Sequence, residues 1–369
     1  MLKAIGCGLG GNFPVVIPYV GIFLRDHWEE ATGQPWWTYH DPDLTGWLKV
    51  EEDLLERLDM DWVNCGLCPP KEWREDHRIE SRGRRAFVVG PSGKREREVR
   101  RDPIGGSHIA IEKEPSIESI EDIDRRIGSL DKQDLIQSGM LDYVKMVVDK
   151  FGSKKFICAS VGTPYWTALC SYFGFKGMTV NLFRRSGLVE RVLERLMENT
   201  VQELRAYADA KVDGIWIEEC LSSATELSLE QFRRFVMPYN EELISEIRKL
   251  GMKSIYYPCG DVRDRLGLMI DMDPDCLSLE ESKKGFDIDI AWVDEIVSGR
   301  TCIFGNLDSI RILQNGTGDE LKREVRRQID IGLKHGRFVM SLGSPVTPLT
   351  PLSRVAEFIE IIRKESASC

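Results

Sequence analysis

Val212-Asp-Gly-Ile-Trp-Ile217 is a short apolar run between two long amphipathic stretches. Runs of this length and composition are typical of strands that are buried on both faces, as in a parallel sheet. Six further runs have the same character: Asp61-Trp-Val-Asn-Cys65, Lys155-Phe-Ile-Cys-Ala-Ser160, Lys253-Ser-Ile-Tyr-Tyr257, Cys276-Leu-Ser-Leu279, Thr301-Cys-Ile-Phe304 and Arg337-Phe-Val-Met-Ser341. The sequence therefore predicts a buried parallel sheet.

The stretches between these runs have the periodicity of helices. Between residues 193 and 208, apolar residues recur at steps of three and four, so that one helical face is hydrophobic. Ser228 and Gln231 form a capping box, an arrangement that opens helices. Strand–helix units that repeat over most of 369 residues predict a (β/α)8 TIM barrel. A doubly wound open sheet is the alternative, because spacing along the chain does not reveal strand order.

We expect a single barrel domain over residues 1–369, with two less regular regions near its start. Residues 1–60 are expected to form an irregular N-terminal extension, and residues 71–107 a hairpin insertion. Within the insertion, residues 85–99 have the pattern of two strands that turn at Pro91-Ser-Gly93, since these residue types favour tight turns.

Composition argues against several classes of protein. The net charge is −10 and no basic stripe stands out, so nucleic acid is not an expected partner. No apolar run approaches the length that spans a bilayer, and the start lacks the pattern of a signal peptide. The ten cysteines are scattered, and several lie inside apolar runs. This favours reduced thiols in the cytoplasm over disulfides.

In a barrel the active site lies at the carboxyl ends of the strands, so the residues that follow each apolar run are the first candidates. These residues include thiols and carboxylates, which bind metals or move protons. They are Asn64, Cys65, Cys68, Thr163, Glu218, Glu219, Cys220, Tyr257, Cys259, Asp261, Glu280, Glu281, Asn306, Asp308 and Ser344. Because side chains alternate along extended backbone, we expect one carboxylate of each acidic pair to point inward.

Several motifs between residues 155 and 364 carry a resemblance to a known family. They are Leu229-Glu-Gln-Phe-Arg-Arg-Phe-Val-Met-Pro-Tyr239, Cys259-Gly-Asp261, Phe304-Gly-Asn-Leu-Asp-Ser309 and Thr347-Pro-Leu-Thr-Pro351. In this order they resemble the uroporphyrinogen decarboxylase superfamily. That superfamily contains decarboxylases and zinc-dependent, corrinoid-linked methyltransferases, and the resemblance implies a TIM barrel.

The chain departs from true uroporphyrinogen decarboxylases at three functional positions. Those enzymes carry an Arg-x-x-x-Arg-Tyr segment, whereas Val16 to Arg25 has one arginine at its end. Their Phe-Ser-Asp motif corresponds to Val63-Asn-Cys-Gly-Leu-Cys68, and their late histidine corresponds to Ser344. A substrate with many carboxylates needs several cations. The resemblance therefore favours the methyltransferase branch.

The resemblance also implies a metal site, which this chain alters. In the methyltransferases a His-x-Cys pair and a later cysteine bind zinc; here these positions are Tyr257-Pro-Cys259 and Ser344. Tyrosine and serine are poor zinc ligands. The zinc site is therefore either lost or rebuilt around Cys259 and Glu219, with further candidates in Cys65, Cys68 and Cys220.

The function that the resemblance implies is methyl transfer between a small methylated substrate, such as an O-methyl compound, and a corrinoid protein. The ether oxygen leaves more readily when an acid protonates it. The candidate acids are Glu219, Tyr257 and Glu281. The candidate substrate-binding residues are Asn64, Cys65, Asn306, Asp308 and Ser344.

Two other functions stay open at this point. One is a decarboxylase or other lyase that acts on a carboxylated substrate, and the other is a ligand-binding barrel without catalysis. A homodimer would be common for the superfamily, but the sequence does not determine the oligomeric state.

Overall fold

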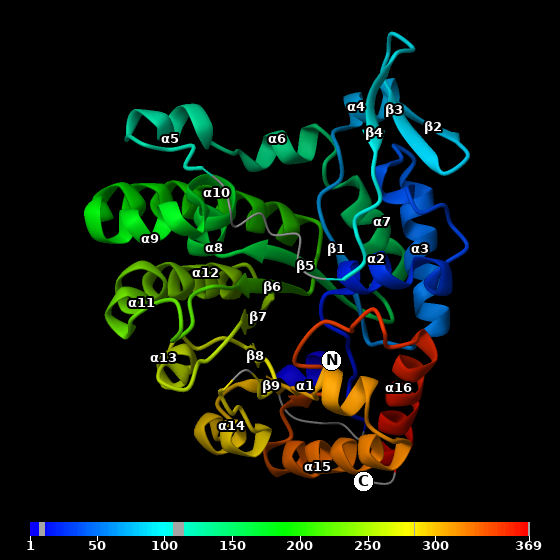
Figure 1. Ribbon diagram of the computed structural model, residues 1–369, viewed down its shortest axis with the longest axis vertical. Coiled ribbons are helices and arrows are strands. Elements are labelled where there is room, and N and C mark those ends of the chain that lie inside the picture. The colour runs from blue at the N-terminus through cyan, green and yellow to red at the C-terminus, as the bar shows by residue number, and fades with distance from the viewer. Residues whose placement is uncertain (7–11, 106–113, 284, 368–369) are drawn as a thin grey trace.

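The computed structural model describes residues 1–6, 12–105, 114–283 and 285–367. At its centre is a curved parallel sheet whose strands lie side by side in chain order (Figure 1). They are β1 (Trp62–Cys65), β5 (Phe156–Gly162), β6 (Gly214–Glu219), β7 (Lys253–Pro258), β8 (Cys276–Ser278), β9 (Cys302–Phe304) and β10 (Phe338–Val339). The prediction of an α/β fold with a buried parallel sheet is confirmed. Sequential order excludes the doubly wound alternative, in which strand order reverses within the sheet.

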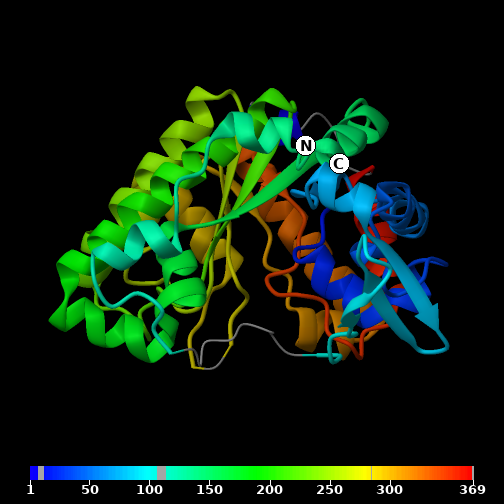
Figure 2. The same ribbon diagram turned by 90° about the horizontal axis from the view of Figure 1, so that it is seen from above.

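Helices surround the curved sheet on its outer side (Figure 2). The shorter ones are α1 (Leu2–Gly6), α4 (Lys71–Asp76), α5 (Glu121–Arg126), α6 (Lys132–Gln137), α8 (Pro164–Ala168), α11 (Leu229–Phe235), α13 (Leu266–Asp271) and α14 (Ile290–Val297). The longer ones are α2 (Val20–Ala31), α3 (Leu44–Arg57), α7 (Asp142–Phe151), α9 (Gly174–Arg184), α10 (Ser186–Asp209), α12 (Met237–Lys249), α15 (Gly318–His335) and α16 (Leu352–Ser366). None of the helices in the described ranges combines the length and hydrophobicity that a bilayer crossing requires.

Three short helical turns complete the elements. A 3-10 turn, η1, covers Thr38–His40, and π-helical turns form η2 (Leu169–Phe173) and η3 (Ser309–Gln314). The capping box expected at Ser228 and Gln231 is present and opens α11.

Residues 14–16 connect the two edges of the sheet. The backbone N–H of Met340, just after β10, donates to Pro14 O at 2.8 Å, and Val16 N–H donates back to Met340 O at 3.0 Å. On the other side, Asp61 N–H, just before β1, donates to Val15 O at 2.9 Å. The segment therefore makes strand-like contacts with both edges.

A small antiparallel sheet projects from the rest of the fold (Figure 1). It consists of β2 (Arg78–Arg82), β3 (Arg85–Val89) and β4 (Arg95–Val99), in that order. Residues 85–99 are thus a hairpin, to which β2 adds a third strand that the sequence did not suggest. The β2 segment has a single apolar residue, Ile79, and so no alternation to recognise. Residues 106 and 107 of the expected insertion lie outside the described residues.

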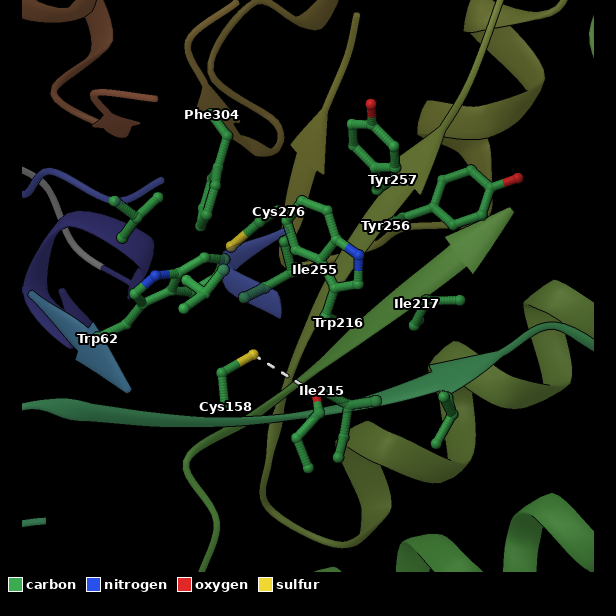
Figure 3. Close-up of a cluster of buried hydrophobic side chains, with 14 of the residues drawn as sticks. Trp62, Cys158, Ile215, Trp216, Ile217, Ile255, Tyr256, Tyr257, Cys276 and Phe304 are labelled. Atoms are coloured by element: carbon green, nitrogen blue, oxygen red, sulfur yellow. Dashed lines mark hydrogen bonds between the residues drawn. The ribbon is translucent and has the colours of Figure 1, made fainter. Parts of the chain in front are cut away.

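Aromatic side chains fill the concave side of the sheet (Figure 3). Trp216 on β6 lies between Trp62 on β1, at a ring-centroid distance of 5.7 Å, and Tyr257 on β7, at 4.9 Å. Phe304 on β9 lies 6.3 Å from Trp62. Rings from alternate positions of several strands thus form a packed interior, and the polar strand ends lie above it.

Candidate active site

The strand β6 continues two residues beyond the apolar run that predicted it, and this extension separates the acidic pair. In the parallel register, Glu218 pairs with Tyr257 and Glu219 pairs with Pro258. Because side chains alternate along a strand, Glu218 lies on the inner face with Tyr257, and Glu219 lies on the opposite face. For this acidic pair, one carboxylate points inward as expected, and it is that of Glu218.

The outer carboxylate, Glu219, is enclosed between β6 and α12. It is fully buried, and its Oε2 accepts a hydrogen bond of 3.1 Å from the side-chain amide of Asn240. Burial raises the pKa of Glu219 to about 7, although the hydrogen bond from Asn240 lowers it. The structure therefore does not bring Glu219 together with Cys259, the other residue of the expected metal pair.

On the inner face, four side chains form what we call the thiol group: Tyr19, Glu218, Cys220 and Cys259. The Sγ atoms of Cys220 and Cys259 lie 2.7 Å apart. The Tyr19 hydroxyl donates to Glu218 Oε1 at 3.3 Å and lies 4.0 Å from Cys259 Sγ. Cys220 Sγ lies 3.8 Å from the same Glu218 oxygen. Two thiols, a phenol and a carboxyl group thus meet at one point.

Burial perturbs the acidity of this group. It raises the pKa of Glu218, and the hydrogen bond from Tyr19 partly offsets the increase. It also raises the pKa of Tyr19, so this phenol stays protonated and acts as a donor. The contact with Cys259, followed by burial, raises the pKa of Cys220. A carboxyl group with a raised pKa is suited to proton donation near neutrality.

Two members of the thiol group lie at or beside strained backbone. Tyr19 has φ 55° and ψ 48°, a left-handed conformation at the residue before α2. Leu221, which follows Cys220, has φ 58°. This conformation is costly for residues with a Cβ atom, and such strain is concentrated at functional sites. The strain at Tyr19 directs its ring into the interior, 5.3 Å from Tyr257.

A cavity of about 400 Å³ opens beside the thiol group. Its lining includes Tyr19, Glu218, Trp62, Asn64 and Trp216. Within the described residues, the buried atoms Trp62 Nε1 and Asn64 Oδ1 have no hydrogen-bond partner. Buried polar atoms are normally paired, so these two are free for a ligand.

A second polar cluster, which we call the lysine cluster, joins the ends of β8 and β10. Lys283 Nζ donates to Glu280 Oε1 at 2.6 Å and to Ser344 Oγ at 2.8 Å, and Ser344 Oγ donates to Glu281 Oε2 at 2.7 Å. Gly343 allows this approach, because a Cβ atom there would lie 2.4 Å from the backbone nitrogen of Glu281.

Within the lysine cluster, burial and neighbouring charges shift the pKa values of Lys283 and Glu281 in opposite directions. Burial alone would lower the pKa of Lys283, but the carboxylates of Glu280 and Glu281 help to outweigh it and leave that pKa raised. Burial raises the pKa of Glu281, which the Lys283 ammonium counteracts. Ser344 and Glu281, both candidates from the sequence, are therefore in direct contact, and Lys283, which the sequence did not indicate, joins Ser344 to Glu280.

The remaining candidates have local partners. Asn306 donates through Nδ2 to Glu280 O at 3.2 Å and to Ile288 O at 2.8 Å. Asp308 caps η3 by accepting from the backbone N–H groups of Ile310 at 2.9 Å and Arg311 at 2.6 Å. These contacts support the loops around the site.

Three further candidates, Tyr257, Cys65 and Cys68, are buried. The Tyr257 hydroxyl donates to Gly343 O at 3.1 Å, and burial raises the pKa of this phenol. Cys65 is buried, which raises its pKa, and it lines a smaller cavity beside the first. Cys68 donates to Met140 O at 3.3 Å, away from the thiol group.

The donor atoms do not fit the zinc site that the resemblance implies. Across the described ranges, no three His, Cys, Asp or Glu side chains are arranged to hold a metal ion. Two sulfurs bound to one tetrahedral zinc at about 2.3 Å each lie roughly 3.8 Å apart, whereas Cys220 and Cys259 lie 2.7 Å apart. At position 344 the ammonium group of Lys283 lies beside the serine hydroxyl, where a second cation would be repelled.

Comparison with known proteins assigns the family. The model of the uroporphyrinogen decarboxylase (URO-D) family matches residues 105–365. The chain belongs to this family. The resemblance inferred from the motifs is therefore confirmed, and the match extends it toward the N-terminus.

Relatives within the family include enzymes of both branches. The methylcobamide:CoM methyltransferase MtbA of Methanosarcina mazei is 21% identical over 66% of this chain and 68% of its own length. MtbA of Methanosarcina acetivorans is 22% identical over 60% of this chain and 62% of its own length. A uroporphyrinogen decarboxylase of Thermus thermophilus is 29% identical over 50% of this chain and 51% of its own length.

A solved structure supports the fold over the full chain. The chain is similar to a methyltransferase from Methanosarcina mazei with a TM-score of 0.70 and 20% identity, over 98% of this chain and 97% of the other. This similarity shows the fold, and the MtbA relatives support the methyltransferase branch that the sequence favoured.

Two residues of the site were missed in the sequence for physical reasons. Tyr19 follows Pro18 outside the runs that were predicted to be strands, and a left-handed φ has no sequence signal when the residue is not glycine. Lys283 lies three residues after Glu280, a spacing that could have suggested an ion pair. Its second contact, with Ser344, requires that the ends of β8 and β10 lie close together, and no local sequence pattern predicts this.

Proposed function

We propose that this protein transfers a methyl group between a small methylated substrate, such as an O-methyl compound, and a corrinoid carried by a partner protein. The similarity to two methylcobamide:CoM methyltransferases supports this proposal most directly. The cavity beside the thiol group, with a buried carboxyl group at its wall, is consistent with it. The partner's corrinoid would accept the methyl group, and the residues of this chain would bind the substrate and supply a proton.

In this proposal Glu218 is the general acid for demethylation. As the methyl carbon leaves the ether oxygen, that oxygen gains negative charge and needs a proton. Glu218 lines the cavity, and burial raises its pKa, which favours the protonated form that donates. The Tyr19 hydroxyl, 3.3 Å from Glu218, would fix the carboxyl group and stabilise the carboxylate that remains.

In the same proposal, the other candidate residues bind the substrate or support the structure around the site. Trp62 Nε1 and Asn64 Oδ1 would pair with polar groups of the substrate, because neither has a partner in the described structure. Tyr257 and Glu281 would hold the strand ends together through Gly343 and Ser344. Glu219 would brace β6 against α12 through Asn240. We derive no step through zinc, because the donor set does not fit that ion.

The proposal also includes the expectations from the sequence about barrel closure, domain organisation, localisation and oligomeric state. Residues 14–16 would close the sheet into a complete (β/α)8 barrel as its eighth strand, which their hydrogen bonds to Met340 and Asp61 support. The chain would act as one domain in the cytoplasm, and the part of the insertion that the structure describes, residues 71–105, would lie at the barrel mouth. A homodimer stays a prediction.

Matched variants of the two neighbouring glutamates test the assignment. Purified protein would be incubated with cob(I)alamin and a panel of O-methyl compounds, and the demethylated product and methylated corrinoid would be quantified. Removing a general acid costs roughly 10²- to 10⁴-fold in rate, so Glu218→Gln should lose that much. Glu219→Gln should stay within a few-fold of wild type, because Glu219 faces away from the cavity.

Other outcomes would redirect the proposal. Equal losses in both variants would remove Glu218 from the acid role. Absence of methyl transfer with every substrate, together with carbon dioxide release from carboxylated compounds, would favour the decarboxylase branch. Two cations near the site already have carboxylate partners: Arg25 Nε lies 2.7 Å from Asp26 Oδ1, and Lys283 pairs with Glu280. The structure therefore provides little for a polycarboxylate.

A further inference from the structure

Cys220 and Cys259 face each other because of the register of β6 and β7. The last paired residues are Glu219 and Pro258, and Cys259 N–H donates to Glu219 O at 3.0 Å. The two cysteines therefore occupy the next opposed position, on the same face as Glu218 and Tyr257. Neighbouring strands are about 4.8 Å apart, and disulfides need Cα atoms about 4.4 to 6.8 Å apart. Opposed residues at this strand spacing fall within the range that a disulfide needs.

The side chains satisfy the remaining requirement. Both cysteines are free thiols, and their sulfurs lie 2.7 Å apart, close to the bond length of about 2.0 Å in a disulfide. Cys259 is half-buried, whereas Cys220 is 8% exposed. A small oxidant therefore has access to Cys259, and the more buried Cys220 is in contact with it.

We propose that Cys220 and Cys259 are a reversible oxidative-modification site, a dithiol that small peroxides convert to an intramolecular disulfide. In the first step the Cys259 sulfur attacks the peroxide O–O bond, which gives a sulfenic acid at Cys259 and water. In the second step the Cys220 sulfur displaces hydroxide from that sulfenic acid, its thiol proton completes a second water, and the S–S bond forms. One hydrogen peroxide is reduced to two waters as the two thiols are oxidised. A dithiol reductant reverses the reaction by thiol–disulfide exchange.

A second cysteine pair in the same sheet is an internal control. Cys276 on β8 and Cys302 on β9 are also register partners. Both are completely buried in the core, whereas Cys259 is half-buried beside the cavity. Cross-strand placement is common to both pairs, so access to the oxidant is the property that distinguishes them. The proposal therefore assigns oxidation to the first pair alone.

Closure of this disulfide would change the site that the proposed function uses. Cys220 Sγ lies 3.8 Å from Glu218 Oε1, and Cys259 Sγ lies 4.0 Å from the Tyr19 hydroxyl. Bond formation consumes the thiol proton of Cys220 and draws both sulfurs toward each other. This consequence for activity rests on the proposed function, whereas the oxidation itself does not.

The test is peptide mapping of the full-length protein without reduction. Reduced protein would be treated with a few equivalents of hydrogen peroxide, its remaining thiols would be alkylated, and its peptides would be identified by mass. We expect a cross-linked Cys220–Cys259 peptide lighter by two hydrogen atoms, which dithiothreitol abolishes. Cys276 and Cys302 should be alkylated only after unfolding. Cys170→Ala, which changes another half-buried cysteine, should leave the cross-link intact.

Two variants make the proposal falsifiable even if activity is never found. In Cys220→Ala, Cys259 should stop at the sulfenic acid or oxidise further, with no cross-link. In Cys259→Ala, Cys220 should resist the same peroxide dose, because its partner was the accessible sulfur. Oxidation of wild type that leaves both cysteines alkylatable, or that links either of them to a third cysteine, would overturn the proposal. An intact cross-link without methyl transfer would instead contradict only the proposed function.

Discussion

Glu218 and Glu219 are neighbours in sequence, yet their carboxylates lie on opposite faces of the sheet. Glu218 lies with Tyr19 and the two cysteines beside the cavity, and Glu219 is buried against Asn240 on α12. The parallel register of β6 with β7 creates this division. Under the proposed function, Glu218 takes part in the chemistry and Glu219 in packing, so we expect opposite results for two otherwise identical substitutions.

Glu219 should make the stability of the protein depend on pH. Its pKa rises from 4.5 to about 7 on folding, so the folded state binds a proton that the unfolded state has released between these values. Its contribution to stability is complete below pH 4.5 and is lost as the pH rises to about 7. This difference corresponds to on the order of 3 kcal/mol. Glu219→Gln, which stays neutral, should flatten the pH dependence of the free energy of unfolding across this window.

Urea unfolding at a series of pH values checks this expectation. Glu51 is a useful comparison, because burial also raises its pKa to about 7 and its hydrogen bond comes from Tyr39, outside the site. Glu51→Gln should produce a similar flattening, and the effects of the two variants should add. Some slope should remain in Glu219→Gln because of Glu51, but a slope as steep as that of wild type would show that Glu219 is ionised in the folded protein.

Much of the fold can be predicted from the sequence because strands and helices are indicated by short, local residue patterns. Each of the apolar runs became a strand, since β-branched and aromatic residues in short runs favour a doubly buried parallel sheet. The site depends on less local information. The alternation of Glu218 and Glu219 required knowing that β6 continues to Glu219, and the partner of Cys259 required the register. Tyr19 depends on a backbone conformation, and Lys283 on the meeting of two strand ends.

Tyr19→Phe should change the pH profile of methyl transfer. The Tyr19 hydroxyl bonds to Glu218 and lowers the pKa that burial has raised, so its removal raises this pKa further. If Glu218 acts as the acid, its protonated form then persists to higher pH. The descending limb of the pH–rate profile should move upward in pH.

The matched control for this measurement is Tyr239→Phe, on α12. Tyr239 is half-buried and donates to Glu190 O, so its loss should leave the profile in place. A limb that stays fixed in Tyr19→Phe, in protein with unchanged thermal unfolding, would argue that Glu218 does not titrate in the reaction.

Asn64→Ala should weaken substrate binding more than turnover. Its Oδ1 is buried at the cavity without a partner in the described structure, so we expect it to accept a hydrogen bond from bound substrate. Loss of one such bond costs about 1 kcal/mol, which corresponds to a several-fold rise in KM. Asn315→Ala, at an exposed position, is the control. An unchanged KM with a reduced kcat would instead place Asn64 at the transition state.

Lys283 should determine whether the site can hold zinc. Its ammonium lies 2.8 Å from Ser344 Oγ and neutralises Glu280 at 2.6 Å, so a metal ion at position 344 would meet a like charge in a partly buried setting. Restoring the family ligands with Tyr257→His and Ser344→Cys should therefore leave zinc binding weak. Adding Lys283→Met removes the ammonium and exposes two carboxylates, and this triple variant should bind about one zinc ion per chain.

Metal analysis of protein purified without chelators, with zinc titration against a chromophoric chelator, separates the variants. Tight zinc binding by the double variant would show that the ligand residues alone determine whether zinc binds. Lys283 would then only hold the ends of β8 and β10 together.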